Sequence, residues 1–170
     1  MNNFFWSHNN KLHLGQWHKG GLIFYFLQSG DLGYDAGVQH GLITTTSDQS
    51  ASMVWDPDPW AYINTNQAIG YGKQNTDYAV TVIGAGTYAA KHCSDLLLNG
   101  YDDWYLPAAY EMIKMFDAKS IIQLPESVVY WSSHNVSAYY AKSFTYTGNT
   151  ASLTDRDKTV SCRVRAIRSF

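Results

Sequence analysis

Charged side chains are scarce in this chain: they make up 15% of its 170 residues, and neither sign dominates. Twelve Lys and Arg stand against 14 Asp and Glu, which gives a formal net charge of −2. General nucleic-acid binding needs a basic excess, so we expect no nucleic-acid partner. The longest apolar run near the start, residues 22–27, is far shorter than the roughly 20 residues of a membrane span. Membrane insertion is therefore not expected, and no signal-peptide pattern opens the chain.

Cysteine is also rare. Cys93 and Cys162 are the two in the sequence, and neither belongs to a CxxC pair or to another metal-ligand spacing. A zinc site is therefore not expected. Two interpretations stay open for the pair. They are either two buried free thiols, or a disulfide whose long loop would stabilise the fold by roughly 4 kcal/mol.

The sequence has no motif of a known catalytic class. GxSxG, HExxH and GxxxxGKS/T are missing, and the GYG at 70–72 lacks the third glycine of a dinucleotide-binding loop. His40 is the strongest lone catalytic candidate, although a histidine bonded to the backbone is the more common case. Asp48, Asp56 and Asp58 could surround a calcium ion, but they lack the DxDxDG order of a dedicated loop. We expect no enzyme and no cofactor, with calcium kept as the alternative.

Apolar and aromatic side chains, in contrast, are plentiful, at 45% and 15% of the residues. A chain of this length and composition can build the core of one domain. We place this domain at residues 15–170. Residues 1–14 are rich in asparagine and show no clear period, and we interpret them as a leader or junction segment.

The order of predicted elements indicates an α+β fold. Short apolar runs between turn residues predict strands at 22–27, 41–45, 128–132, 138–146 and 161–168. Helical periodicity predicts helices at 75–82, 89–98 and from 106 onward. Residues 47–72 have no convincing period and are predicted to form a long surface loop. Because strands precede and follow the helices, we expect the two ends of the domain to meet in one sheet.

Cations cluster near the C-terminus despite the neutral total. The last fifteen positions hold five of them, at Arg156, Lys158, Arg163, Arg165 and Arg168. This grouping predicts a local basic face.

The segment from 130 to 142 mixes Tyr and Trp with Ser and Asn. Recognition surfaces use this composition, because aromatic rings supply rigid area and small polar groups supply adaptable hydrogen bonds. Rings of Tyr and Trp also stack on the apolar faces of sugars. We expect Trp131 to lie in the core. We expect exposure for His134, Asn135, Ser137, Tyr139 and Lys142.

A set of short motifs in a fixed order resembles one known family. The motifs are GGLIFY at 20–25, HGLI at 40–43, SDQS at 47–50, IGYG at 69–72, NT at 75–76, AA at 89–90 followed by Cys93, NGYDDWYLP at 99–107, YWSS at 130–133 and VRAIR at 164–168. Together they resemble the C-terminal domain family of the Legionella collagen-like adhesin, over residues 15–170. Each motif alone is weak, whereas the ordered set is specific.

The resemblance implies a C-type-lectin-like α+β domain with a small mixed or antiparallel sheet, two main helices and long loops. It implies a homotrimer at the end of an extracellular surface protein or phage tail fibre. The named adhesin binds sulfated polysaccharides through basic residues, and phage relatives vary the stretch after YWSS to change receptor. No EPN or QPD triplet is present, so the calcium-dependent sugar site of C-type lectins is not carried over.

We therefore expect a non-enzymatic adhesin that binds a cell-surface glycan or other receptor. The predicted ligand-binding residues are His134, Asn135, Ser137, Tyr139, Tyr140, Lys142, Thr147, Asn149, Arg156 and Lys158. Two alternatives remain: a structural cap or trimerisation domain without ligand, and an enzyme of the formylglycine-generating type. The latter needs a reactive cysteine pair.

Overall fold

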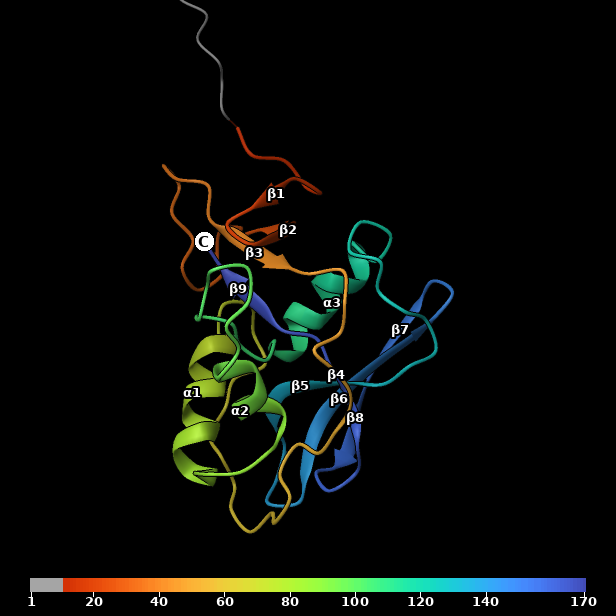
Figure 1. Cartoon of the computed structure of the whole chain (residues 1–170). Helices are drawn as coiled ribbons and strands as arrows, with labels where there is room; N and C mark the ends of the chain where they lie inside the picture. Colours follow the sequence, from red (N-terminus) through yellow and green to blue (C-terminus); the bar gives the residue numbers. More distant parts are fainter. Residues whose placement is uncertain (1–10) are drawn as a thin grey trace, which may run out of the picture.

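The computed structural model describes residues 11–170, so residues 1–10 of the predicted leader lie outside the described residues. The elements are β1 (Trp17–His18), β2 (Gly21–Phe26), β3 (Gly41–Thr44), β4 (Ser50–Met53), α1 (Gly72–Ile83), α2 (Ala89–Ser94), α3 (Ala109–Asp117), β5 (Tyr130–Asn135), β6 (Tyr140–Thr147), β7 (Thr150–Asp157), β8 (Cys162–Val164) and β9 (Ile167–Ser169). Strands, helices and strands follow one another as predicted, and the fold is α+β (Figure 1).

The strands form two sheets instead of the one small sheet that was expected. One has the order β1-β2-β3-β9 and the other the order β4-β8-β5-β6-β7. β9 pairs with β3, so the N-terminal and C-terminal strands do meet in one sheet. β5 and β8 are parallel, and the other described pairs are antiparallel. The described chain has three helices, the number that periodicity predicts, whereas the family resemblance implied two main helices.

The chain passes between the two sheets twice, and both crossovers meet at Asp48. One crossover joins β3 to β4 and the other joins β8 to β9, so the strand predicted at 161–168 is two strands in different sheets. Asp48 accepts hydrogen bonds from Arg165 Nε at 2.7 Å and from Arg163 Nη1 at 2.8 Å. The hydroxyl of Tyr130, on β5, donates to the same carboxylate at 3.0 Å. These three contacts to the Asp48 carboxylate fix the two sheets relative to each other.

The prediction of a basic face at the C-terminus is wrong. Arg165 is 1% exposed and Lys158 is 0% exposed. Arg168 is also buried, and its Nε and Nη2 donate to the two carboxylate oxygens of Asp103, each at 2.6 Å. The other two cations of the group are partly exposed. Most of this charge is therefore paired or covered inside the fold instead of facing a ligand.

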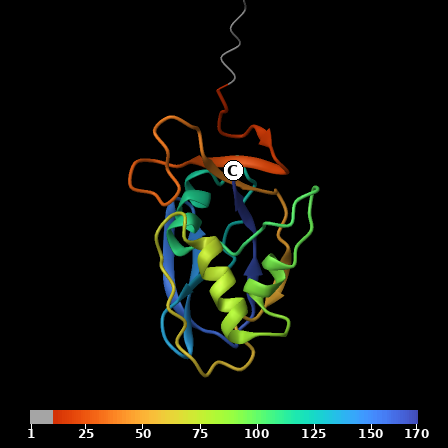
Figure 2. The same ribbon diagram turned by 90° about the vertical axis from the view of Figure 1, so that its left-hand side faces the viewer.

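Three tryptophans anchor a core cluster that includes residues of α1 and α2, which lie side by side in Figures 1 and 2. Trp55, Trp104 and Trp131 are each at most 1% exposed, which confirms Trp131 as a core residue. Trp131 Nε1 donates to Met53 O at 2.9 Å, so burying the ring leaves no polar group unpaired. A second cluster, under α3, contains Met112, Met115, Tyr130 and Phe144.

The first two helices differ from their predicted bounds. α1 begins before Asn75 and Thr76, so these residues are buried inside the helix instead of capping it. The hydroxyl of Thr76 accepts the N–H of Leu106 at 3.0 Å and thereby ties α1 to the strand-like segment before α3. α2 ends before Leu97, which was predicted on its apolar face and is 74% exposed. Periodicity alone therefore did not locate either boundary.

A buried carboxylate sets the start of α3, which begins after Pro107 and not at 106. Glu111 is 0% exposed, and its Oε2 accepts the N–H of Ala108 at 2.7 Å. Its Oε1 accepts the N–H of Gly70 at 2.9 Å, which joins α3 to the loop before α1. Burial raises the pKa of Glu111 to about 7.

We predict that this group makes the protein less stable as the pH rises from about 5 to about 8. The folded state keeps the proton of Glu111 up to its pKa of about 7, whereas the ordinary pKa of the carboxyl is 4.5, so folding takes up a proton between these values. The free energy of unfolding should fall by about 1–3 kcal/mol across the window. Urea unfolding at both pH values measures it. Glu111→Gln should flatten the slope, and an unchanged slope in this variant would contradict the assignment.

Candidate functional site

The residues predicted to bind a ligand lie along β5, β6 and β7 and do not form one site. β6 begins at Tyr140 and ends at Thr147, and its 8 residues place these ends about 24 Å apart. Thr147 and Asn149 are therefore at one end of the β6–β7 hairpin. Ser137, Tyr139 and Tyr140 are at the other end, in and beside the β5–β6 turn.

The predicted residues between these ends are engaged with the protein itself. Lys142 forms an ion pair with Asp155 across the hairpin. His134 Nδ1 lies 3.2 Å from the hydroxyl of Thr65. Burial, with a smaller effect of Lys142, lowers the pKa of His134, so its ring is neutral at pH 7. Arg156 Nε donates to a serine hydroxyl of β6 at 3.3 Å.

Two of the predicted residues lie inside the protein, so the expectation that they face a ligand at the surface is wrong. Asn135 is 1% exposed, and neither atom of its side-chain amide has a hydrogen-bond partner among residues 11–170. Lys158 is 0% exposed. Its carbonyl accepts the N–H of Trp55 at 2.9 Å, which draws the residue beneath the loop after β4. The segment that covers Lys158 lies about a hundred residues away in the chain, so the sequence around position 158 does not predict this burial.

Lys158 joins three segments that are remote in sequence. Its N–H donates to Tyr139 O at 3.0 Å, and its Nζ donates to Ala61 O at 3.3 Å. The ammonium group lies 4.7 Å from the centroid of the Trp55 ring, within cation–π range. Lys158 thus holds the β5–β6 turn next to the segment that starts near residue 60.

That segment, residues 60–66, alternates between solvent and protein. Ile63 is 1% exposed in the core, and the hydroxyl of Thr65 accepts the N–H of Asn135 at 2.7 Å. The outward side chains are Trp60, Tyr62, Asn64 and Asn66. Alternation of this kind marks an extended chain. This alternation is visible in the sequence WAYINTN at 60–66. It is the sequence signal that identifies the outward residues of a segment predicted to be a loop without period.

Four large aromatic side chains lie where this segment meets the β5–β6 turn. We name this surface the aromatic end. Its members are Trp60, Tyr62, Tyr139 and Tyr140, with 72%, 58%, 60% and 46% of their surface exposed. Both segments lie at the bottom of Figure 1, opposite the C-terminus and the sheet that contains β9, and Figure 2 agrees from a second side.

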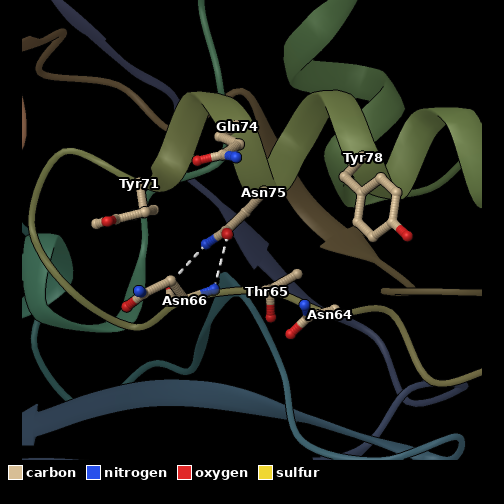
Figure 3. A pocket seen from close by; sticks show the side chains of 7 residues that line it. All are labelled: Asn64, Thr65, Asn66, Tyr71, Gln74, Asn75 and Tyr78. Atoms are coloured by element: carbon tan, nitrogen blue, oxygen red, sulfur yellow. Dashed lines mark hydrogen bonds between the residues drawn. The ribbon is translucent and has the colours of Figure 1, made fainter.

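A cavity of about 390 Å³, the α1 pocket, lies farther along the same segment. It is lined by Asn64, Thr65, Asn66, Tyr71, Gln74, Asn75 and Tyr78. Positions 71, 74, 75 and 78 follow the spacing of one helix face. Figure 3 shows Tyr71 and Tyr78 at the two ends of this row, with the residues of the extended segment opposite. Sequence analysis assigned no binding role to any of these residues.

The two cysteines are buried and free, so the disulfide alternative is not what the structure shows. Burial raises the pKa of the Cys93 thiol far above its ordinary value and raises that of Cys162 to about 11. Neither thiol is a thiolate at neutral pH, so neither is prepared for nucleophilic attack.

The other candidates for chemistry have structural contacts. His40 Nδ1 lies 3.0 Å from Phe170 O, the backbone contact that was expected of a structural histidine. Asp48 is held by two arginines, and Asp56 is 4% exposed. Among residues 11–170 no three His, Cys, Asp or Glu gather as metal ligands, so Asp48, Asp56 and Asp58 do not converge on one point.

The sequence matches no protein-family model and no curated protein. In structure the chain is similar to a fimbrial protein from Bacteroides ovatus ATCC 8483, with a TM-score of 0.58 and 12% sequence identity. The similarity covers 86% of this chain and 43% of the other, so this chain spans less than half the length of that protein. At this identity the likeness shows a shared fold alone. No helix among residues 11–170 is long and apolar enough to cross a bilayer.

We predict that Lys158→Met leaves stability at pH 7 unchanged or raises it, whereas Lys158→Ala lowers it by about 1–3 kcal/mol. Burial lowers the pKa of Lys158 to about 8, below its ordinary 10.5, so keeping the ammonium in the folded state costs free energy even though it remains the major form at pH 7. Methionine keeps the packed stem without the charge, and alanine keeps neither. Urea unfolding compares the three proteins. Equal losses in both variants would show that the ammonium contacts, not the stem, hold the segments together.

Proposed function

We propose that this chain is a non-enzymatic recognition module of the adhesin kind, which binds a cell-surface glycan through the aromatic end. One observation carries the proposal: two segments, far apart in sequence, expose four large aromatic side chains at one end of the fold. Large aromatic residues are mostly buried on average, and exposed apolar patches mark interaction sites. A fold that leaves these rings in solvent therefore offers them to a partner.

Sugar rings suit this surface chemically. The faces of Trp60 and the tyrosines can stack on the apolar faces of sugars, while the hydroxyl groups of Tyr139 and Ser137 can meet sugar hydroxyls. The backbone beneath the rings is held by the N–H of Lys158, which donates to Tyr139 O, and by the buried side chain of Ile63, so little chain entropy is lost on binding. Tyrosine and tryptophan also have few rotatable bonds to order.

The C-type-lectin-like fold and the family of the Legionella collagen-like adhesin belong to the same proposal. The α+β layout and the long loop before α1 are compatible with both, and the similar structure is one named a fimbrial protein. We propose, with that resemblance, a homotrimer displayed outside the cell or on a phage tail fibre. Three aromatic ends on one fibre would compensate for weak single sites through avidity.

We predict that Tyr139→Ala combined with Tyr140→Ala weakens binding to glycan arrays and host cells by about tenfold, because each stacked ring contributes about 0.5–1.5 kcal/mol. Trp60→Ala alone should weaken binding severalfold for the same reason. Binding is measured with and without EDTA, so that a calcium requirement is visible in the same assay.

A matched control for this experiment is Trp17→Ala. Trp17 is 58% exposed on β1, in the other sheet, and its removal should leave binding unchanged. Equal binding by the Trp60 and Trp17 variants would refute the aromatic end as the ligand surface. An array without any bound glycan, with trimers intact by light scattering, would favour the structural cap.

We also predict that the native protein gives no fast reaction with a thiol reagent, and that the unfolded protein reacts at two thiols. Both cysteines are buried, and their raised pKa values suppress the thiolate. Time-resolved labelling of native and urea-unfolded protein makes the comparison. A cysteine that is labelled rapidly in the native state would instead support the alternative that the chain is an enzyme of the formylglycine-generating type.

A further inference from the structure

We infer that the α1 pocket is a second ligand site, separate from the aromatic end, and that it takes a single uncharged sugar ring. The inference goes beyond the proposed function, because it stands whether or not the aromatic end binds a glycan. It rests on three features of the pocket: a fixed floor, a free polar rim, and a lining without charge.

The floor is fixed by Asn75. Its Oδ1 accepts the N–H of Asn66 at 2.9 Å, and its Nδ2 donates to Asn66 O at 2.6 Å, as Figure 3 shows. The same Nδ2 donates to the hydroxyl of Ser133, on β5, at 3.0 Å. The side-chain amide of Asn75 thus pairs with both backbone groups of Asn66, as a neighbouring strand would. This pairing holds the extended segment at a fixed distance from α1. The cavity is pre-formed, as small-molecule sites usually are.

The rim, in contrast, has polar groups without partners. Among residues 11–170, no hydrogen bond engages the amides of Asn64 and Gln74 or the hydroxyls of Tyr71 and Tyr78. Amides and phenols both donate and accept hydrogen bonds. Behind the rim, the backbone N–H of Asn135 donates to the hydroxyl of Thr65, which lines the pocket, and the buried side-chain amide of Asn135 has no partner among residues 11–170. The site therefore offers a surplus of donors and acceptors around one small space.

The lining decides the chemical class of the ligand. None of the seven lining residues is charged, and the nearby Lys73 is paired with Asp77 at 2.6 Å. Anionic ligands and metal ions, which need charged partners, are therefore disfavoured. A volume of about 390 Å³ is near the lower end of the range for small-molecule sites, about 300–1,000 Å³. A neutral pyranose presents hydroxyls around its edge and apolar C–H faces, which match free amides and the flanking tyrosine rings.

The test is an NMR titration of the full chain with the methyl glycosides of glucose, galactose, mannose and N-acetylglucosamine, and with methyl glucuronide as the charged counterpart. We expect a neutral glycoside to bind in the millimolar range and to shift backbone amide signals of residues 64–66 and 71–78. Tyr78→Ala and Gln74→Ala should each weaken this binding by about three- to tenfold. Tyr34→Ala is the matched control, since Tyr34 is 42% exposed, close to the 46% of Tyr78, and lies outside the pocket.

The Tyr139→Ala, Tyr140→Ala protein separates the two sites. The α1 pocket is supported if the double variant still binds the methyl glycoside and the Tyr78→Ala variant binds it more weakly. The opposite result, loss with the aromatic-end variant and retention with the Tyr78 variant, overturns the pocket and leaves the aromatic end standing. A preference for the glucuronide overturns the uncharged class. The inference also fails if no neutral glycoside shifts these amides.

Discussion

One carboxylate, that of Asp48, links the two sheets, because both passages of the chain between them meet there. Arg165, which is 1% exposed, binds it from the second crossover, Arg163 binds it from β8, and the Tyr130 hydroxyl binds it from β5. A buried charge that loses its partner typically costs about 3–5 kcal/mol, so the three elements are strongly constrained to one arrangement. The position of β5 follows from this constraint, and β5 in turn carries the residues that support the α1 pocket.

The cations near the C-terminus lie mainly in the interior of the protein. Lys158, Arg165 and Arg168 come from the most cationic part of the sequence and are all buried. The α1 pocket has no charged lining residue, and the aromatic end is defined by four exposed rings. Stacking and neutral hydrogen bonds do not depend on net charge, so the low net charge of the chain is compatible with the proposed recognition.

The extended segment 60–66 connects both candidate surfaces. Ile63 packs in the core, Thr65 bonds to β5, and Ala61 receives the ammonium of Lys158. Because inward and outward side chains alternate, every inward contact also orients its outward neighbours toward solvent. The aromatic rings at one end and the amides at the other are thus positioned by the same few contacts, although the segment belongs to neither sheet.

Local pattern was sufficient for the α+β order, for most strands and helices, for the core position of Trp131 and for the exposure of Tyr139. These properties depend on periodicity and on residue type within a few positions, which a sequence displays directly. The burial of Asn135 and Lys158, the split of the last strand between two sheets, and the α1 pocket were decided by tertiary contacts. Each of these arises where segments tens of residues apart cover one another, and no local pattern encodes which distant segment will do so.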